Sequence, residues 1–302
     1  MTDTLVEVES RTLKLSNLDK VLYPEAGFTK GQVIDYYRRI APVLLPHLAG
    51  RPLTLKRYPN GVDQGHFYEK RCPSHRPEWV QTAEVWSDRN KGIVPYCVVD
   101  GLPTLVWVAN LASLELHTSL SLGDEIARPT MVVFDLDPGP PADIVDCCRV
   151  AIRLRALFDR MNLQSFAKTS GSKGLQLYIP LNTEVAYEPG TKDFAFAVAQ
   201  SLEKRFPDEI VSSMKKELRP GKVLIDWSQN DEHKTTVCVY SLRAKARPTV
   251  SAPVTWDEVE ACAETGTPLG FEWDDVLARV ERVGDLFAPL LTLRQKLPST
   301  AE

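Results

Sequence analysis

The stretch Met131-Val-Val-Phe-Asp-Leu-Asp-Pro-Gly139 is an apolar strand that ends in two carboxylates. Side chains two positions apart in a strand point to the same side, so Asp135 and Asp137 present their oxygens to one point before the chain turns. Two like charges held this close favour a cation, and carboxylate oxygens suit Mg²⁺ or Mn²⁺. A surface turn with two aspartates before Pro-Gly is the competing interpretation.

A third carboxylate, Asp226, ends another apolar strand, Val223-Leu-Ile-Asp226. If the two strands are neighbours, three carboxylates converge at one edge of a sheet. That is the minimum set for a two-metal site, in which one ion activates an attacking 3′-hydroxyl and the other holds a triphosphate. Taken alone, Asp226 is also a good cap for the turn that follows it.

The elements expected around these strands alternate in the order typical of an α+β sheet. Downstream of the first strand we expect a helix, two strands, a helix and two strands, at residues 142–161, 165–169, 175–180, 191–206, 222–227 and 234–240. This order is close to a split βαβ sheet with helices on one face. Upstream we expect a helix that starts after a capping Thr29, a strand, a polar loop and an apolar helix, at residues 30–48, 51–58, 86–92 and 105–116.

The length and composition predict one compact protein with two lobes. A chain of 302 residues that is 43% hydrophobic can bury a full core. We expect a single domain at residues 11–290, with an N-terminal lobe at about 11–120 and a catalytic lobe at about 121–290. The leader (1–10) and the tail (291–302) are expected to be flexible.

The charge and the cysteines limit the classes of function. A net charge of −4 means that any nucleic-acid binding depends on local basic patches. The sequence has neither an apolar run long enough to cross a membrane nor a signal peptide, which predicts a cytoplasmic, nucleoid-associated protein with no membrane partner. The six scattered cysteines predict reduced thiols, and a zinc site at Cys72 and His75 lacks a second pair of ligands.

Two further segments suit nucleotides and nucleic acid. Lys168-Thr-Ser-Gly-Ser-Lys-Gly174 offers backbone amides, hydroxyls and ammonium groups to a phosphate, although its spacing is not that of a P-loop and a plain hairpin is an alternative. Phe67 and Tyr68 lie in a polar context where exposed rings can stack on bases, with core filling as the alternative for one of them. His117 is, on composition, expected to be a buried hydrogen-bonded histidine at the end of the apolar helix.

The ordered set of motifs resembles a known family, the polymerase domain of bacterial ATP-dependent DNA ligase D in the archaeo-eukaryotic primase superfamily. The resemblance runs from about residue 12 to 290. Its motifs are Asn17-Leu-Asp-Lys-Val-Leu-Tyr-Pro24, Arg51-Pro-Leu-Thr-Leu-Lys-Arg-Tyr-Pro-Asn-Gly61, Phe67-Tyr-Glu-Lys70, Glu115-Leu-His117, Phe134-Asp-Leu-Asp-Pro-Gly139, Thr169-Ser-Gly-Ser-Lys-Gly174, Lys222-Val-Leu-Ile-Asp-Trp-Ser-Gln-Asn230, Lys234-Thr-Thr236 and Tyr240-Ser-Leu-Arg243.

The resemblance implies a primase-polymerase fold, in which an RRM-like split βαβ catalytic sheet packs against an N-terminal α/β lobe. It implies a nucleotidyltransferase that extends primers and fills gaps in end joining or related repair, uses two Mn²⁺ or Mg²⁺ ions and prefers ribonucleoside triphosphates. The implied partners are gapped or end-paired DNA with a 5′-phosphate, a separate DNA ligase and Ku.

The resemblance also implies roles for single residues. The implied metal ligands and catalytic residues are Asp135, Asp137 and Asp226. The implied nucleotide contacts are Lys56, His117, Ser170, Lys173, Gln176, Lys234 and Arg243, with Ser170 sensing the 2′-hydroxyl. Asn17, Lys20 and Lys30 are implied to bind the 5′-phosphate, Phe67 and Tyr68 to stack on the template, and Arg219 to contact the templating side. Residues 86–92 lie where the family carries a loop that aligns DNA termini.

The sequence departs from the family in four places. Gln176 stands where a histidine is usual, Tyr68 where a phenylalanine is usual, and the segment from His117 to Phe134 is shorter. The Lys-x-Asp-Gly adenylation motif of a ligase is missing, so sealing is expected to come from another protein.

Two other functions compete with this interpretation. Phosphatases of the haloacid dehalogenase type also place Asp-x-Asp after a strand, but they carry it near the N-terminus and follow it with a small or hydroxyl residue rather than Pro138. A non-catalytic DNA-end-binding factor of the same fold would keep the phosphate pocket, and the three carboxylates argue against it.

Overall fold

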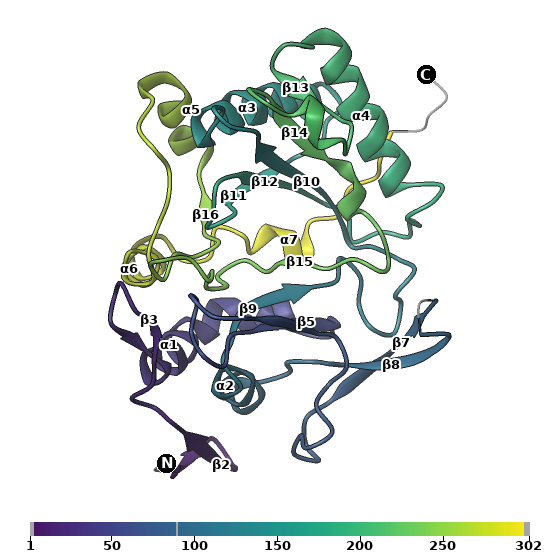
Figure 1. Cartoon of the computed structure of the whole chain (residues 1–302). Helices are drawn as coiled ribbons and strands as arrows, with labels where there is room; N and C mark the ends of the chain where they lie inside the picture. The colour runs from purple at the N-terminus through teal and green to yellow at the C-terminus, as the bar shows by residue number, and fades with distance from the viewer. Residues whose placement is uncertain (1–2, 89, 299–302) are drawn as a thin grey trace. The chain divides into compact units, whose positions relative to one another are not determined.

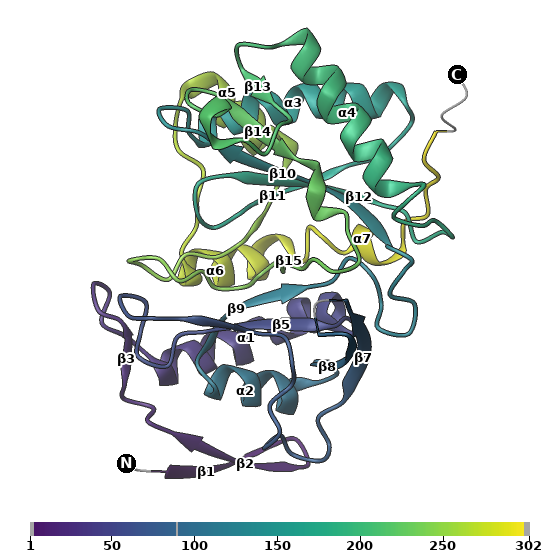
Figure 2. The same cartoon turned by 45° about the vertical axis from the view of Figure 1, so that its right-hand side comes forward.

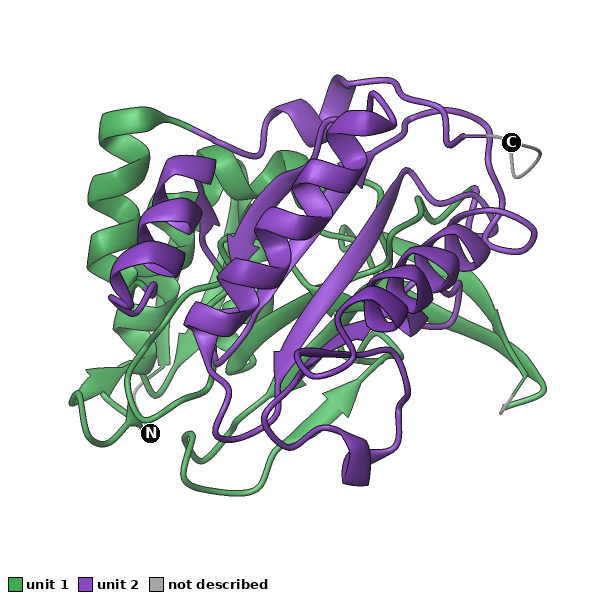
Figure 3. Ribbon diagram, turned by 90° about the horizontal axis from the view of Figure 1, so that it is seen from above, with its two compact units in different colours: residues 1–124, 235–251, 271–284 green, residues 125–234, 252–270, 285–302 purple. Residues whose placement is uncertain are grey.

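The computed structural model describes residues 3–88 and 90–298, which form two compact units (Figure 3). Unit 1 consists of residues 1–124, 235–251 and 271–284, and unit 2 consists of residues 125–234, 252–270 and 285–302. The first crossing between the units is close to the expected lobe boundary at about residue 120. The division into two continuous lobes is nevertheless wrong, because two later segments join unit 1.

Unit 2 is built on a six-stranded sheet in the order β13-β14-β10-β12-β11-β16 (Figure 1). Its strands are β10 (Met131–Pro138), β11 (Phe166–Thr169), β12 (Leu175–Pro180), β13 (Ile210–Val211), β14 (Val223–Asp226) and β16 (Pro253–Val254). The central order β14-β10-β12-β11, with one helix after β10 and another after β12, is the expected split βαβ arrangement.

The helices of unit 2 decide which face of its sheet carries the aspartates. They are α3 (Ile144–Arg160), α4 (Thr191–Arg205), α5 (Trp256–Thr265) and α7 (Pro289–Thr292), with short 3₁₀ turns η1 (Lys216–Leu218) and η2 (Trp227–Gln229). Figure 2 shows α3, α4 and α5 on one side of the sheet. The ring of Phe134 packs toward that side, 5.1 Å from Phe158 of α3 and 6.3 Å from Phe194 of α4 between centroids. Asp135 and Asp137 therefore point to the opposite face.

An asparagine completes the edge of β10 where its neighbour ends. β14 pairs with β10 only from Asp135 onward. Beyond that point, Val133 donates its N–H to Asn230 Oδ1 (2.9 Å), and Asn230 Nδ2 donates to the carbonyl oxygens of Val133 (2.8 Å) and Trp227 (2.9 Å). The fully buried amide thus takes the place of a strand for one residue.

Unit 1 contains a second sheet, in the order β15-β9-β5-β8-β7, with β6 also paired to β5. Its strands are β5 (Leu53–Arg57), β6 (Phe67–Glu69), β7 (Thr82–Ser87), β8 (Gly92–Cys97), β9 (Ser113–Thr118) and β15 (Thr236–Val237). Two separate hairpins are β1 (Asp3–Val8) with β2 (Arg11–Ser16) and β3 (Val21–Tyr23) with β4 (Phe28–Thr29), and the helices are α1 (Lys30–Leu48), α2 (Leu102–Asn110) and α6 (Trp273–Val283). Thr29 caps α1 as expected, through a capping box with Gln32.

Alternation divides the unit 1 sheet into an apolar face and a charged face. Leu55 and Leu116 are register partners with fully buried side chains. The next positions, Lys56 opposite Glu115 and Thr54 opposite His117, point to the other side. A lysine, a glutamate and a histidine from two neighbouring strands thereby share one face.

Three expectations about local structure are wrong. Asp3–Val8 forms a strand paired with Arg11–Ser16 instead of a loose leader, because this hairpin satisfies the backbone of both segments. The helix expected at residues 105–116 ends at Asn110, since Ala112 has a positive φ of 57° that no helix accommodates. His117 therefore lies in β9 rather than at a helix end, and the strand expected at residues 234–240 is only Thr236–Val237.

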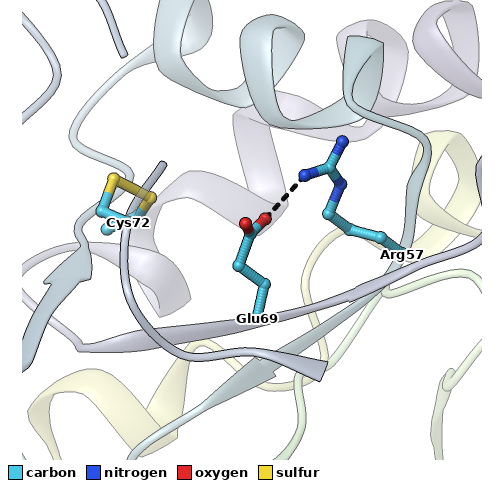
Figure 4. The surroundings of a disulfide bond; sticks show 4 residues. Arg57, Glu69 and Cys72 are labelled. Carbon is cyan, nitrogen blue, oxygen red and sulfur yellow. Dashed lines mark hydrogen bonds and ion pairs between the residues drawn. A yellow bond between two sulfur atoms is a disulfide. The ribbon is translucent and has the colours of Figure 1, made fainter. Parts of the chain in front are cut away.

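The cysteines also differ from expectation. Cys72 and Cys97 form a disulfide with their Cα atoms 4.8 Å apart, close to the ion pair of Arg57 with Glu69 (Figure 4). The loop at Cys72 reaches β8 through a backbone hydrogen bond to Pro95 (2.7 Å), which the spacing in the sequence does not reveal. Zinc binding by Cys72 is excluded in this state, and the other four cysteines are free and buried.

Two further expectations concern the loop at residues 86–92 and the C-terminal tail. Because Ser87 and Gly92 already pair as the last residues of β7 and β8, the loop is shorter than expected and forms the turn of this hairpin, and Arg89 lies outside the described residues. In the expected flexible tail, Gln295 binds the carbonyl oxygens of Pro180 (2.9 Å) and Gln164 (3.0 Å), while residues 299–302 lie outside the described range. Within residues 3–88 and 90–298, no helix has the length and apolar character needed to cross a membrane.

We expect Asn230→Ala to lower the free energy of unfolding by about 2–4 kcal/mol, because it removes three hydrogen bonds and leaves both backbone groups of buried Val133 unpaired on that side. Urea unfolding followed by circular dichroism measures the change. Asn90→Ala, at an exposed turn, is the control and should change little. Equal stability of the two variants would contradict the role given to Asn230.

Candidate functional site

The strands that carry the three aspartates are neighbours, as the two-metal interpretation requires. Asp135 of β10 is the direct register partner of Asp226 of β14, and Asp137 lies two positions along β10 on the same face. The capping interpretation of Asp226 also holds. Its Oδ1 accepts from the N–H (2.9 Å) and hydroxyl (2.6 Å) of Ser228, and its Oδ2 accepts from Gln229 Nε2 (2.8 Å).

The position of Asp135 is electrostatically unfavourable for a carboxylate. Burial raises the pKa of Asp135 to about 7, and the nearby charges of Asp137 and Asp226 act in the same direction. A hydrogen bond from Gln176 and the charge of Lys168 oppose this shift of the pKa. The three carboxylates therefore disfavour one another's ionised forms on this face of the sheet, and a bound cation would stabilise those forms.

Lys168 and Gln176 extend the aspartates into a polar row across four strands. Asp226, Asp135, Gln176 and Lys168 are successive register partners on β14, β10, β12 and β11. The ammonium of Lys168, only 1% exposed, donates to Gln176 Oε1 at 2.5 Å. This contact leaves the amide nitrogen of Gln176 for Asp135. From the sequence, Lys168 belonged to a segment that offers ammonium groups to a phosphate, whereas the structure buries it opposite Gln176 in a four-residue strand.

The chemistry of these side chains fits a hard divalent cation. Asp135 and Asp137 lie on the same face of β10 and each charge is felt by the other, while the charge of Lys168 partly compensates that of Asp135. In the described part of the chain, no three His, Cys, Asp or Glu side chains converge into a metal-binding group. Asp226 lies in register, but its carboxylate is directed at Ser228 and Gln229. Asp135 and Asp137 are therefore the ligands that the geometry supports most directly.

The Gly-rich turn joins β11 to β12 and approaches β10. Ser170 Oγ accepts hydrogen bonds from the backbone N–H groups of Ser172 (3.2 Å) and Gly174 (3.1 Å), which shapes the turn. A Cβ at Gly174 would lie 2.0 Å from the carbonyl oxygen of Leu136, so only glycine permits this approach to β10. Lys173, between them, is exposed. The hairpin interpretation is thus correct, and Lys173 stays available to an anion.

Two other predicted basic residues of unit 2 have defined partners. Lys234 Nζ donates to Ser228 Oγ at 2.6 Å, and the same hydroxyl donates to Asp226. Lys234 is therefore linked to Asp226 through the hydroxyl of Ser228. Arg219 donates to the carbonyl oxygen of Met214 (2.7 Å) in the loop that packs against the end of β10 at Gly139.

In unit 1, three predicted nucleotide contacts surround one buried carboxylate. Glu115, 1% exposed, lies 3.3 Å from Lys56 Nζ, 2.9 Å from His117 Nε2 and 3.3 Å from Arg243 Nε. It also accepts the N–H of Ala244 (3.1 Å). Burial alone would raise the pKa of Glu115, but His117, Arg243 and Lys56 together hold this pKa well below its usual value. Glu115 belongs to a motif of the resemblance, but sequence reasoning assigned it no role.

The predicted aromatic pair lies beside this cluster and is accessible. The side chains of Phe67 and Tyr68 are 44% and 57% exposed, so core filling is excluded for both. Lys56 Nζ lies 5.4 Å from the centroid of the Tyr68 ring, and the guanidinium of Arg57 lies 5.1 Å from that of Phe67. The Tyr68 ring also makes an edge contact with His117 at 6.0 Å between centroids.

The residues predicted to bind a 5′-phosphate meet at the start of α1. The backbone of Lys30 donates to the carbonyl oxygen of Lys20 (2.8 Å), whose backbone in turn donates to Asn17 (3.0 Å). Lys30 Nζ is buried and donates to the carbonyl oxygen of Ser16 (2.6 Å). Burial, the charge of Lys20 and the charge of Arg57 lower the pKa of Lys30 to about 8. Closely spaced cations of this kind favour an anion.

Comparisons with known proteins agree with the resemblance read from the motifs. A family model described as "LigD, primase-polymerase domain" matches residues 29–287. The multifunctional non-homologous end joining protein LigD of Mycolicibacterium smegmatis is 44% identical over 281 residues, which are 92% of this chain and 36% of that protein. The bifunctional LigD of Bacillus subtilis is 32% identical over 289 residues, which are 96% of this chain and 46% of that protein.

A solved structure is similar over nearly the whole chain. It is the polymerase domain of Mycobacterium tuberculosis ligase D in complex with DNA, with a TM-score of 0.86 and 41% identity, covering 94% of this chain and 99% of that one. The chain spans less than half the length of the curated relatives named above. The predicted fold class is therefore confirmed, and the match is to one domain of those longer proteins.

We expect the isosteric substitution Asp135→Asn to stabilise the protein in the presence of a chelator. Because the folded-state pKa of Asp135 is raised to about 7 from 3.8, the folded state binds this proton more tightly than the unfolded chain does. The stability contributed by protonated Asp135 is therefore lost as the pH rises from 3.8 to about 7. At pH 8 the asparagine variant should be more stable by on the order of 1–2 kcal/mol, and its loss of stability between pH 5 and 8 should be smaller.

Urea unfolding at several pH values tests this expectation. Asp208→Asn, at an exposed aspartate of the same unit, is the matched control. A wild-type pH profile that Asp135→Asn leaves unchanged would show that the fold does not raise the pKa of the Asp135 carboxyl.

Proposed function

Because the chain belongs to the LigD primase-polymerase family, we propose that it is a template-dependent nucleotidyltransferase of DNA repair that extends primers and fills short gaps. The single observation that carries this proposal is the face of the unit 2 sheet on which Asp135, Asp137 and Asp226 lie together. Members of the family are metal-dependent nucleotidyltransferases, and a group of carboxylates on one face is what such an activity requires.

The residues of unit 2 have distinct tasks in this proposal. Asp135 and Asp137 hold a divalent cation, Mn²⁺ or Mg²⁺, with Asp226 as a third ligand for a pair of ions. A bound divalent cation supplies Lewis-acid activation of a primer 3′-hydroxyl and neutralises charge on the triphosphate. Gln176 aims the Asp135 carboxylate, and Ser228 joins Lys234 to Asp226. No side chain needs to act as a dedicated general base.

We propose nucleotide contacts for residues of each unit by itself. Lys56 and Arg243 supply positive charge for the phosphates of a ribonucleoside or deoxyribonucleoside triphosphate, and His117 lies beside them. Lys173 is exposed on the Gly-rich turn, where backbone amides can also bind phosphate. Ser170 on the same turn is proposed to sense the 2′-hydroxyl and to give a preference for ribonucleotides.

DNA recognition is assigned to exposed rings and to the basic start of α1. Phe67 and Tyr68 can stack on unpaired template bases, and their exposure supports this use. Arg219 is proposed to contact the templating side. Asn17, Lys20 and Lys30 are proposed to bind a 5′-phosphate on the downstream strand. The similar solved structure is described as a complex with DNA, which supports DNA binding here.

The names of the relatives support a place in non-homologous end joining. We propose that gapped or end-paired DNA is the substrate and that a DNA ligase and Ku act on the same ends. Location in the cytoplasm at the nucleoid stays a prediction.

We expect Asp135→Asn to lower primer extension by roughly a hundredfold or more while DNA binding changes less than about twofold, since the substitution removes one metal-ligand charge. Single-nucleotide extension on gapped DNA measures activity with Mn²⁺ or Mg²⁺ and with both sugar types, and fluorescence anisotropy measures DNA binding. Asp208→Asn is again the control. A wild-type protein that binds gapped DNA but extends nothing would support the alternative of a non-catalytic end-binding factor.

We expect Lys30→Met to remove most of the preference for a 5′-phosphorylated gap over a 5′-hydroxyl gap, about tenfold in Kd, because a charge-assisted contact to phosphate is lost. The same preference should weaken in the wild type as the pH rises from 7 to 9, because the pKa of Lys30 is lowered to about 8 and its positive charge disappears in that window. Anisotropy titrations with the two gaps test both effects.

Lys14→Met removes an exposed lysine of the same unit that pairs with Asp3 (2.6 Å), and it should leave the preference unchanged. Equal wild-type affinity for the two gaps would rule out the phosphate pocket at Lys20 and Lys30.

A further inference from the structure

The ring of His117 makes one hydrogen bond among the described residues, from Nε2 to Glu115 Oε2 at 2.9 Å. A neutral histidine carries its proton on one ring nitrogen, and the partner decides which. If the partner carboxylate is ionised, it can only accept, so Nε2 must donate.

Glu115 has the surroundings of a permanently ionised group. Its side chain is buried between the ammonium of Lys56 on β5 and the guanidinium of Arg243, both at 3.3 Å, and it accepts the N–H of Ala244. A protonated carboxyl between two cations and a backbone donor would lose these charge-assisted contacts.

The same two cations disfavour a second proton on His117. Burial lowers the pKa of His117 and Glu115 raises it, but the charges of Arg243 and Lys56 add to the effect of burial, so the net direction is down. The ring of Tyr68, on β6, also packs against the imidazole in a T-shaped arrangement. The free protein thus holds His117 neutral near pH 7.5.

We propose that Glu115 is a positioning residue that locks neutral His117 in the tautomer with its proton on Nε2, so that Nδ1 offers a lone pair to the bound nucleotide. This inference rests on the proposed function for its ligand, but its geometry lies entirely in unit 1. A nitrogen that accepts selects a hydrogen-bond donor, and the donors of a nucleoside triphosphate are its sugar hydroxyls and base N–H groups. At neutral pH, His117 therefore recognises a hydroxyl or N–H group, and the phosphates are left to Lys56 and Arg243.

Long-range ¹H–¹⁵N correlation spectra of the free protein at pH 7.5 test the tautomer directly. The spectrum of His117→Gln identifies the His117 signals among the five histidines. We expect a single tautomer with protonated Nε2. A protonated Nδ1, or a rapid mixture of the two tautomers, would overturn the proposal without bearing on whether the protein is a polymerase.

Glu115→Gln tests whether the carboxylate is the cause. An amide can face Nε2 with either its oxygen or its NH₂ group, so the single tautomer should be lost. Glu69→Gln is the matched control, because Glu69 is another ion-paired carboxylate of the same sheet, held by Arg57 at 2.8 Å. Persistence of the single tautomer in Glu115→Gln would refute the role of Glu115. If that variant does not fold, the wild-type spectrum still decides the tautomer.

The role of Nδ1 predicts different effects for two amide substitutions. The side-chain amide of asparagine reaches the position of Nδ1, whereas that of glutamine reaches the position of Nε2. We expect His117→Asn to keep nucleotide affinity within about threefold of wild type and His117→Gln to lose about tenfold or more, as measured by titration with a fluorescent ribonucleoside triphosphate. The reverse order would overturn the assignment of Nδ1. Wild-type protein that binds no nucleotide would instead defeat the proposed function and leave the tautomer to the spectra.

Discussion

The antiparallel register of β10 with both of its neighbours is the constraint on which the candidate site depends. It sets Asp226 against Asp135 from one side and Gln176 against Asp135 from the other. A shift of one residue would turn every side chain of β10 to the other face, moving Phe134 out of its contacts with α3 and α4. The apolar contacts on one face therefore hold the carboxylates together on the other.

Each unit places its charged residues on one face of a sheet, but with opposite sign. In unit 2 three carboxylates lie on one face, with buried Lys168 as a counter-charge at the far end of the polar row. In unit 1 a single carboxylate, Glu115, is surrounded by Lys56, Arg243 and His117. The first arrangement suits a cation and the second suits an anion. A polymerase needs both, because its substrate is a polyanion and its metal ions carry positive charge.

The sequence was sufficient where side-chain periodicity carries the information. Alternation placed Asp135 and Asp137 on one face, and helical spacing with a capping Thr29 fixed α1 to the residue. The sequence was insufficient where a single backbone angle decides the end of an element, or where a contact between distant residues decides the pairing. Ala112, with φ of 57°, ends an apolar helix and begins β9, and Cys72 reaches Cys97 only through the fold. Glu115 was given no role and Lys168 was assigned to a phosphate, because the partners of a charge inside a short strand are unknown until the register is known.

Gln176 stands where the family usually has a histidine, and its neighbours in the sheet fix which end of its amide donates and which accepts. An imidazole at this position could exchange protons with its surroundings, whereas an amide has a fixed donor and a fixed acceptor. The two ends of an amide are similar in shape, so their orientation depends on the neighbours. Lys168 Nζ and the Tyr178 hydroxyl both donate to Oε1, at 2.5 and 3.3 Å, and thereby direct the NH₂ group at Asp135. Gln176 consequently does not titrate in its hydrogen bond with Asp135. Lys168, on the next strand, sets the orientation of the amide so that Gln176 is the donor.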